Sequence, residues 1–278
     1  MKKYKFMLKK AISITVNTIS PSSGSHLRDK LVRLKTLLQG QAVVVGDTQR
    51  VSANEHPQGL VLAKDLVAKQ FVRSGNEQIS SNLFAVATVI IGVWAEIPDF
   101  GDLFLGHLHK RCPYTVPYYV AREENQTQED YNKAQGYMDK DGVMENKQAF
   151  LKRMSGYIRL YASVICSPMP RAFNKPHPYS LDNGWKWLIR VLNLEPRPDV
   201  TATILVDFLE TAGCAMQQAY GTQFNKLLAV LCQYYLPKIR QVSASDSSGP
   251  LTRLEDFLRK CVERNRIAPP EDLLSENF

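Results

Sequence analysis

The chain has 278 residues, 44% of them hydrophobic, and a formal net charge of +8. This hydrophobic content is enough for a continuous core and argues against a disordered chain. The five cysteines are odd in number, widely spaced and without a C-x-x-C pair, which argues against a secreted disulfide framework and favours buried thiols in a reducing compartment. The basic excess favours an anionic partner, such as a nucleic acid, a phosphorylated small molecule or an acidic protein face.

We expect the first residues not to form a secretion signal. Their lysine-rich start resembles the beginning of a signal peptide, but Lys9 and Lys10, followed by Ser13 and Thr15, interrupt any apolar stretch. The strongest apolar run, residues 83–95, is shorter than the ~18 residues needed to cross a bilayer. We therefore expect no membrane insertion.

The first predicted helix follows a stripe of leucines. It covers residues 27–38, with Ser25 as its N-cap and Gly40 as its stop. A loop over residues 41–58 follows, because glycine and proline punctuate it. Strand-like alternation in this loop is confined to Val43–Val45 and Val51.

Three further helices are predicted before the middle of the chain. The pattern favours one over residues 60–73, which ends at Gly75. Residues 83–95 carry no charge, so we expect that helix to be buried on nearly every side. A shorter helix, capped by Asp99, ends at Cys112.

The second half is also helical. Residues 113–119 are non-helical, an acidic segment follows at 123–130, and residues 168–178 form a proline-rich connector. Apolar stripes predict helices over residues 150–165, 182–194, 199–220, 223–239 and 251–262, with a flexible break at 243–249 before the last one. Paired helices without strands predict an all-α, HEAT-repeat-like helical solenoid, with residues 1–278 as a single domain.

The sequence lacks the common catalytic motifs. It contains no phosphate loop, no dinucleotide fingerprint, no H-E-x-x-H and no G-x-S-x-G. His107 and His109 are about 200° apart around a helix, so rim histidines are a better interpretation than a zinc site. Cys112 lies beside basic residues that could lower its pKa, but without an evident histidine partner a structural thiol is favoured. We therefore expect a binding protein and no enzyme.

A basic cluster is the main candidate site. His107, Lys110 and Arg111 stand at i, i+3 and i+4 of one predicted helix and share a face. Lys69 and Arg73 stand at i and i+4 of an earlier helix. If these helices pack side by side, their cations can converge on one concavity, which suits a polyphosphate better than a duplex. From spacing alone, a solvated charged face is the favoured alternative.

Lys64 is excluded from this cluster. It lies nine residues before Arg73, half a revolution around the predicted helix.

Several longer sequence words resemble one known family. They are GDL at 101–103, LHKRCPY at 108–114, FLKRMSG at 150–156 with IRLY at 158–161, NGWKWL at 183–188, LNLEP at 192–196, DVTAT at 199–203 and DFLE at 207–210. Together they resemble the C-terminal domain of the GLE1 family of nuclear-pore mRNA-export factors, from about residue 8 to 270. The family's fold is all-helical and HEAT-like, in agreement with the helical pattern.

The resemblance implies a mechanism. The family's domain binds a DEAD-box RNA-dependent ATPase at the cytoplasmic face of the nuclear pore complex, and also works in the cytoplasm and nucleus. It promotes separation of the two helicase lobes, release of RNA and remodelling of exported messenger ribonucleoprotein. Other implied partners are a segment of an FG-repeat nucleoporin and translation initiation and termination factors.

Inositol hexakisphosphate is the ligand that the resemblance implies, as a bridge between the two proteins. The family's basic pair before Cys-Pro falls on Lys110 and Arg111, and a third basic position falls on His107, where some members carry arginine. Lys69 and Arg73 are assigned to the same inositol-phosphate and helicase interface by their face and spacing.

Two other function classes stay open as alternatives. A helical-repeat scaffold that binds RNA directly needs aromatic and basic residues interleaved on one long face, which the sequence lacks, so direct RNA binding is disfavoured. An enzyme acting on a phosphorylated substrate needs a base, a nucleophile or a metal site, and none can be named.

Overall fold

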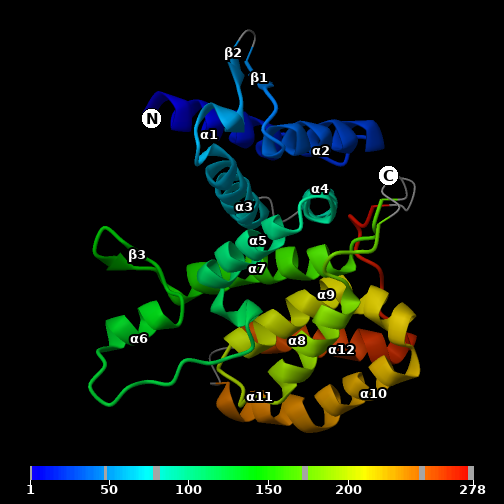
Figure 1. Ribbon diagram of the computed structural model, residues 1–278. Coiled ribbons are helices and arrows are strands. Elements are labelled where there is room, and N and C mark those ends of the chain that lie inside the picture. Colours follow the sequence, from blue (N-terminus) through cyan, green and yellow to red (C-terminus); the bar gives the residue numbers. More distant parts are fainter. Residues whose placement is uncertain (1, 47–48, 78–81, 171–174, 244–247, 275–278) are drawn as a thin grey trace. The chain divides into compact units, whose positions relative to one another are not determined.

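The computed structural model describes residues 2–46, 49–77, 82–170, 175–243 and 248–274 (Figure 1). The chain forms two compact units. Unit 1 contains residues 1–108, 167–179 and 272–278, and unit 2 contains residues 109–166 and 180–271.

Unit 1 consists of helices and one short hairpin. Its elements are α1 (Lys2–Asn17), α2 (Gly24–Leu38), β1 (Val43–Val45), β2 (Gln49–Val51), η1 (Ala53–Glu55), α3 (Gly59–Glu77), α4 (Leu83–Glu96) and most of α5 (Asp99–Arg111). Helix α1 packs against α2 and α3, and α2 packs against α4. The antiparallel hairpin pairs Val43 with Val51, so the weak strand signal at this place is confirmed.

Helix α1 is absent from the sequence prediction. Its buried residues Leu8, Ala11, Ile12, Thr15 and Val16 follow helical spacing. The hydroxyl of Thr15 donates a hydrogen bond to the Ala11 carbonyl at 2.9 Å, so a polar side chain is accommodated on the buried face. The lysines and hydroxyl residues of this segment are therefore compatible with an amphipathic helix.

Two predicted helix boundaries in unit 1 are wrong. The N-cap of α2 is Ser23, whose hydroxyl oxygen accepts a hydrogen bond from the His26 amide at 3.1 Å, and Ser25 lies inside the first turn. Helix α3 continues through Gly75, which is buried. A glycine inside a helix costs only about 1 kcal/mol, which packing of the surrounding turns can offset.

Helix α4 is buried over almost its whole length. Every residue from Leu83 to Trp94 is buried, as predicted for this uncharged stretch. The indole of Trp94 stacks on the Tyr179 ring with centroids 5.1 Å apart. A Cβ atom at Gly101 would lie about 2 Å from the indole, so α5 approaches α4 closely only because glycine stands there.

Ion pairs hold the end of α4. The Glu96 carboxylate lies 2.8 Å from the Lys35 ammonium and 3.1 Å from that of Lys175. Hydrogen bonds from both lysines keep the pKa of Glu96 below its ordinary value. Residues 175–179 thus rejoin α4 after the chain has passed through the first segment of unit 2.

Unit 2 is built around α9. Its elements are η2 (Pro113–Thr115), α6 (Gln128–Ala134), β3 (Asp139–Lys140), β4 (Val143–Met144), α7 (Lys147–Cys166), α8 (Leu181–Leu192), α9 (Val200–Tyr220), α10 (Thr222–Val230), the π-helical turn η4 (Leu231–Tyr235), α11 (Leu236–Val242) and α12 (Ser248–Arg264). Helix α9 packs against both α7 and α12 (Figure 1). Trp187 of α8 is 2% exposed, stacks on Phe208 and donates its indole N–H to the Tyr114 carbonyl at 3.0 Å.

These elements confirm the all-α fold class. The packing of α7 on α9 and of α9 on α12 is the helix-on-helix pairing that the sequence predicts. The β3–β4 hairpin was not predicted, and the break at 243–249 lies mostly outside the described residues. The single-domain assignment stays a prediction. No helix in the described ranges is long and apolar enough to cross a membrane.

Substitution of Trp94 tests the packing around α4. We expect Trp94→Ala to lower the free energy of unfolding by about 3–5 kcal/mol, because the lost indole contacts leave a cavity between α4, Gly101 and Tyr179. Urea denaturation followed by circular dichroism measures this change. Val61→Ala is the control, since Val61 is 69% exposed. Equal midpoints for the two variants would contradict the assigned role of Trp94.

Candidate functional site

Helix α5 carries three of the five predicted site residues. Its buried side consists of Phe100, Gly101, Phe104 and Leu108. Its first turn holds Asp99 and Asp102, and its last turn holds His109, Lys110 and Arg111, so the charges complement the helix dipole at both ends. The favourable interaction of Lys110 and Arg111 with the helix dipole is a structural reason for these residues that requires no ligand.

The boundary between the two units falls inside α5, after Leu108. Lys69, Arg73 and His107 therefore belong to unit 1, and Lys110 and Arg111 belong to unit 2. His107, Lys110 and Arg111 share a helical face, as predicted from their spacing. Convergence of all five residues on one concavity stays a prediction.

In unit 1, α3 and α5 are joined by two polar contacts. The Lys64 ammonium lies 2.5 Å from Asp99, and the His107 Nε2 lies 2.7 Å from Asp65 Oδ1. Side-by-side packing of these helices was a condition of the predicted cluster, and these two contacts show that α3 and α5 touch within unit 1. Lys64 faces Asp99, in keeping with its exclusion from the basic cluster.

Asp65 changes the electrostatics of the predicted cluster. It lies one helical turn before Lys69, which is exposed, and its carboxylate contacts the imidazole of His107. A negative charge thus sits among cations that were assigned to a polyphosphate. The sequence spacing did not reveal it, because Asp65 and His107 are 42 residues apart.

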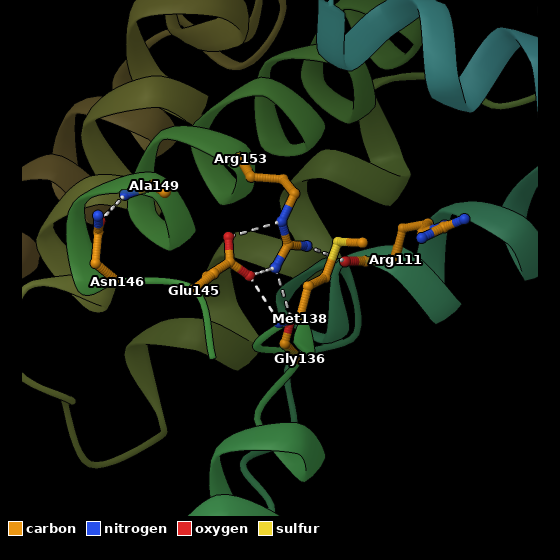
Figure 2. Close-up of polar contacts among 7 residues, drawn as sticks. All are labelled: Arg111, Gly136, Met138, Glu145, Asn146, Ala149 and Arg153. Atoms are coloured by element: carbon orange, nitrogen blue, oxygen red, sulfur yellow. Dashed lines mark hydrogen bonds and ion pairs between the residues drawn. The ribbon is translucent and has the colours of Figure 1, made fainter. Parts of the chain in front are cut away.

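In unit 2, Arg153 anchors the C-terminal end of α5. Its guanidinium donates to the Arg111 carbonyl oxygen at 3.3 Å and to the Gly136 carbonyl at 2.8 Å (Figure 2). The guanidinium also contacts Glu145: its Nε lies 3.2 Å from Oε1, and its Nη2, which donates to Gly136, also contacts Oε2. Glu145 in turn accepts the Met138 amide at 2.7 Å.

This anchor fixes the backbone of Arg111 and leaves its side chain directed elsewhere. Figure 2 shows the Arg111 side chain pointing away from the Arg153 guanidinium. Both Lys110 and Arg111 are exposed. A carbonyl at a helix C-terminus lacks an intrahelical partner, and Arg153 supplies one. Two exposed cations are thereby presented from a helix end with a fixed backbone.

The charge of Arg111 also reaches Tyr157 on α7. Burial raises the pKa of the Tyr157 phenol, against the opposing influence of the Arg111 and Arg153 guanidinium groups.

The two histidines and Cys112 have different surroundings. His109 Nδ1 lies 2.8 Å from the Thr115 hydroxyl oxygen, and burial lowers the pKa of its imidazole. His107 faces Asp65 instead, so the two histidines have different partners. Cys112 is fully buried, and burial raises the pKa of its thiol to about 12, which confirms a structural thiol. In the described ranges, no group of three or more histidine, cysteine or acidic residues could hold a metal ion.

Sequence reasoning missed the Arg153–Glu145 anchor. Arg153 stands three residues after Phe150 on the α7 stripe, and a charged residue so near a buried face was the available signal. Its partners at Arg111, Gly136 and Glu145 could not be identified from spacing.

Comparisons with known proteins give consistent matches. A family model described as GLE1-like protein matches residues 1–232. The mRNA export factor GLE1 of Mus musculus is 42% identical over 281 residues, covering 100% of this chain and 40% of that protein. The mRNA export factor Gle1 of Drosophila melanogaster is 36% identical over 286 residues, covering 100% of this chain and 41% of that protein. The chain thus spans about 40% of the length of these relatives.

A solved structure shares the fold. It is described as a Saccharomyces cerevisiae Dbp5 C-terminal domain variant bound to Gle1 and IP6, where IP6 is inositol hexakisphosphate. The match has a TM-score of 0.82 and 17% sequence identity, and covers 99% of this chain and 88% of the matched one.

Arg153→Met tests the anchor at the end of α5. We expect it to lower the free energy of unfolding by about 1.5–3 kcal/mol, because Glu145 loses a charged hydrogen-bond partner and two carbonyls lose a donor. Urea denaturation measures the loss, and limited proteolysis at the β3–β4 hairpin reports local release. Lys152→Met, an exposed neighbour, is the control. An Arg153→Met variant with the parental midpoint and hairpin protection would rule the anchor out.

Proposed function

The chain belongs to the GLE1-like protein family, and we propose that it acts in mRNA export by binding and stimulating a DEAD-box RNA-dependent ATPase. The supporting observation is the fold match, at a TM-score of 0.82, to a structure that holds Gle1 with Dbp5 and IP6. In this proposal the chain favours separation of the helicase lobes. RNA release and ribonucleoprotein remodelling follow from that separation.

The proposed role is non-catalytic. The sequence offers no phosphate loop or activated nucleophile, and the relatives are named mRNA export factors. The chain would act through binding energy, by stabilising one arrangement of the helicase lobes over another. A ligand can shift such an equilibrium only as far as its affinities for the two states differ, so the interface must distinguish open from closed helicase.

We assign the contact surface to Lys69, Arg73, His107, Lys110 and Arg111. A polyphosphate bound there would present further phosphates to the helicase and thus join two basic surfaces. Lys110 and Arg111 are the stronger part of this assignment, because both are exposed and the Arg111 backbone is anchored. Asp65 weakens the unit 1 part, since its carboxylate contacts His107. Inositol hexakisphosphate is accordingly the proposed bridging ligand.

Further partners and the location are proposed from the family resemblance. They are a segment of an FG-repeat nucleoporin and translation initiation and termination factors. The proposed site of action is the cytoplasmic face of the nuclear pore complex, with further roles in the cytoplasm and nucleus.

A helicase assay tests the proposal. ATP turnover by a cognate DEAD-box protein with RNA is measured with and without the chain, and with and without inositol hexakisphosphate. We expect Lys110→Asp with Arg111→Asp to weaken inositol hexakisphosphate binding at least about tenfold, because each reversal replaces a charged hydrogen bond by repulsion. The phosphate-dependent part of the stimulation should fall with it, and binding should weaken with added salt.

Lys152→Asp with Lys226→Asp is the matched control, since both lysines are exposed in unit 2. If this control loses as much affinity as the test variant, general charge and not a site explains the binding. ATP hydrolysis by the purified chain, or a failure to stimulate any cognate helicase, would overturn the proposed function.

Asp65→Asn tests the unit 1 part of the surface in the opposite direction. We expect inositol hexakisphosphate to bind about two- to fivefold more tightly at low salt, because the change removes a negative charge beside Lys69 and His107. Calorimetric titration measures the affinity, and the gain should shrink as salt is added. Asp102→Asn, an exposed acid elsewhere on α5, is the control. An unchanged affinity for Asp65→Asn would remove Lys69 and His107 from the site.

A further inference from the structure

The solvent-facing side of α1 is strongly basic. Its five lysines, Lys2, Lys3, Lys5, Lys9 and Lys10, are all exposed and are called here the lysine face. The helix contains no aspartate or glutamate. Within the described part of the chain, none of the five has an ion-pair partner. Such a row of uncompensated cations attracts a polyanion.

An aromatic ring stands within the lysine face. The Phe6 side chain is 65% exposed, and Lys2 and Lys9 flank it at helical spacing of four and three residues. Because most of the Phe6 side chain is exposed, it contributes little to the packing of unit 1. It offers a flat surface on which an unpaired base can stack.

The opposite side of α1 is already occupied. Leu8, Ile12 and Val16 are at most 1% exposed, because α1 packs against α2 and α3. A helix that binds a membrane surface needs a free apolar face to enter the lipid. The burial of this face therefore argues against a lipid surface as the partner.

A cavity adjoins the lysine face within unit 1. It has a volume of about 500 Å³ and is lined by Lys3 and Met7 of α1, by Arg50 of β2 and by Glu55. This volume lies within the range of small-molecule pockets, so a single base or nucleoside fits. The wall of the cavity is fixed, because the Tyr4 hydroxyl donates to the Ser52 and Ala53 carbonyls at 3.2 Å.

The cavity retains two available cations. One carboxylate also lines the cavity, that of Glu55, which accepts the Ser52 amide at 2.7 Å as part of a capping box and keeps its negative charge. Lys3 and Arg50 are exposed. The arrangement matches a phosphate-binding face beside a pocket for a base.

We propose that the lysine face, Phe6 and the adjoining cavity bind single-stranded nucleic acid. The lysines contact backbone phosphates, Phe6 stacks on a base, and the cavity receives a second one. A duplex is a poorer ligand, because its bases are already stacked and paired. This inference is independent of the proposed function, since it needs neither a helicase nor inositol hexakisphosphate.

The inference changes one expectation from the sequence. From the sequence, direct RNA binding was disfavoured because no long face with interleaved aromatic and basic residues was found. The structure supplies such a face in α1, a helix that the sequence pattern did not predict.

Fluorescence anisotropy with a short labelled oligo(U) and the full chain tests the proposal. We expect the parent to bind with an affinity that falls as salt rises. Combined Lys2→Glu, Lys5→Glu and Lys9→Glu should weaken binding at least about tenfold, because phosphate contacts turn into repulsion. Phe6→Ala should weaken it about fivefold or more through lost stacking. Both variants change exposed side chains, and circular dichroism verifies that they are folded.

The control carries the same change in net charge on unit 2, as Lys152→Glu, Lys226→Glu and Lys260→Glu, all at exposed positions. Its affinity should stay within about threefold of the parent. If the two triple variants lose the same affinity for oligo(U), the net charge of the chain explains the binding, and the proposed site on α1 is wrong. Equal affinity for a duplex of the same length, or binding of the parent to phosphatidylserine vesicles but not to oligo(U), would overturn the ligand class. Oligo(dT) in parallel distinguishes RNA from DNA as the source of the shared chemistry.

Discussion

The guanidinium of Arg153 holds together three parts of unit 2 that lie far apart in the sequence. It contacts the last carbonyl of α5, the Gly136 carbonyl before the β3–β4 hairpin and the Glu145 carboxylate after it. Only arginine has a planar group with enough donors to satisfy these acceptors together. The Arg153 side chain is only 12% exposed, so the contacts to Gly136 and Glu145 are partly shielded from water, whereas the contact to the Arg111 carbonyl is exposed. The contact to the Arg111 carbonyl ties the backbone that carries Lys110 and Arg111 to α7.

The charged side chains of the protein fall into two groups. Some form ion pairs within the chain, and others are exposed and available to a binding partner. Lys64 faces Asp99, Lys147 contacts the buried Asp199, and Arg253 contacts the buried Asp207. The last two cations balance carboxylates that would be costly to bury alone, whereas Asp99 is exposed. Within the described ranges, the unbalanced excess includes the lysine face of α1 and the exposed end of α5. The net charge of +8 is therefore informative about binding only after the internal pairs are known.

Local patterns predicted most of the helices and the spacing within the candidate site. Residues 83–95 were correctly assigned to a buried helix, because a helix without charged residues has no side that favours solvent. The last turn of α5 was also predictable, since i, i+3 and i+4 residues always share a face. Helix α1 was missed because lysines and threonines obscure its apolar stripe, and Thr15 fits the buried face only through its bond to the Ala11 carbonyl.

Contacts between distant residues could not be predicted. Asp65 lies 42 residues from His107, and Arg153 lies 42 residues from Arg111, so no periodicity links them. The continuation of α3 through Gly75 was also not predictable from local sequence. Tertiary packing there outweighs the low helix propensity of glycine. The sequence did not identify which carboxylate or carbonyl group each cation contacts.

The return of residues 175–179 to unit 1 has a consequence for synthesis on the ribosome. The Ala95 carbonyl accepts a hydrogen bond from Lys175, 80 residues later, and Trp94 receives its stacking partner Tyr179 later still. At elongation rates of about 5–20 residues per second, the end of α4 waits several seconds for these partners. During that interval the Trp94 indole lacks its stacking partner, although α2 and α3, which pack against α4, have already been made. Chaperone capture of the emerging polypeptide would therefore matter most between the appearance of α4 and that of Tyr179.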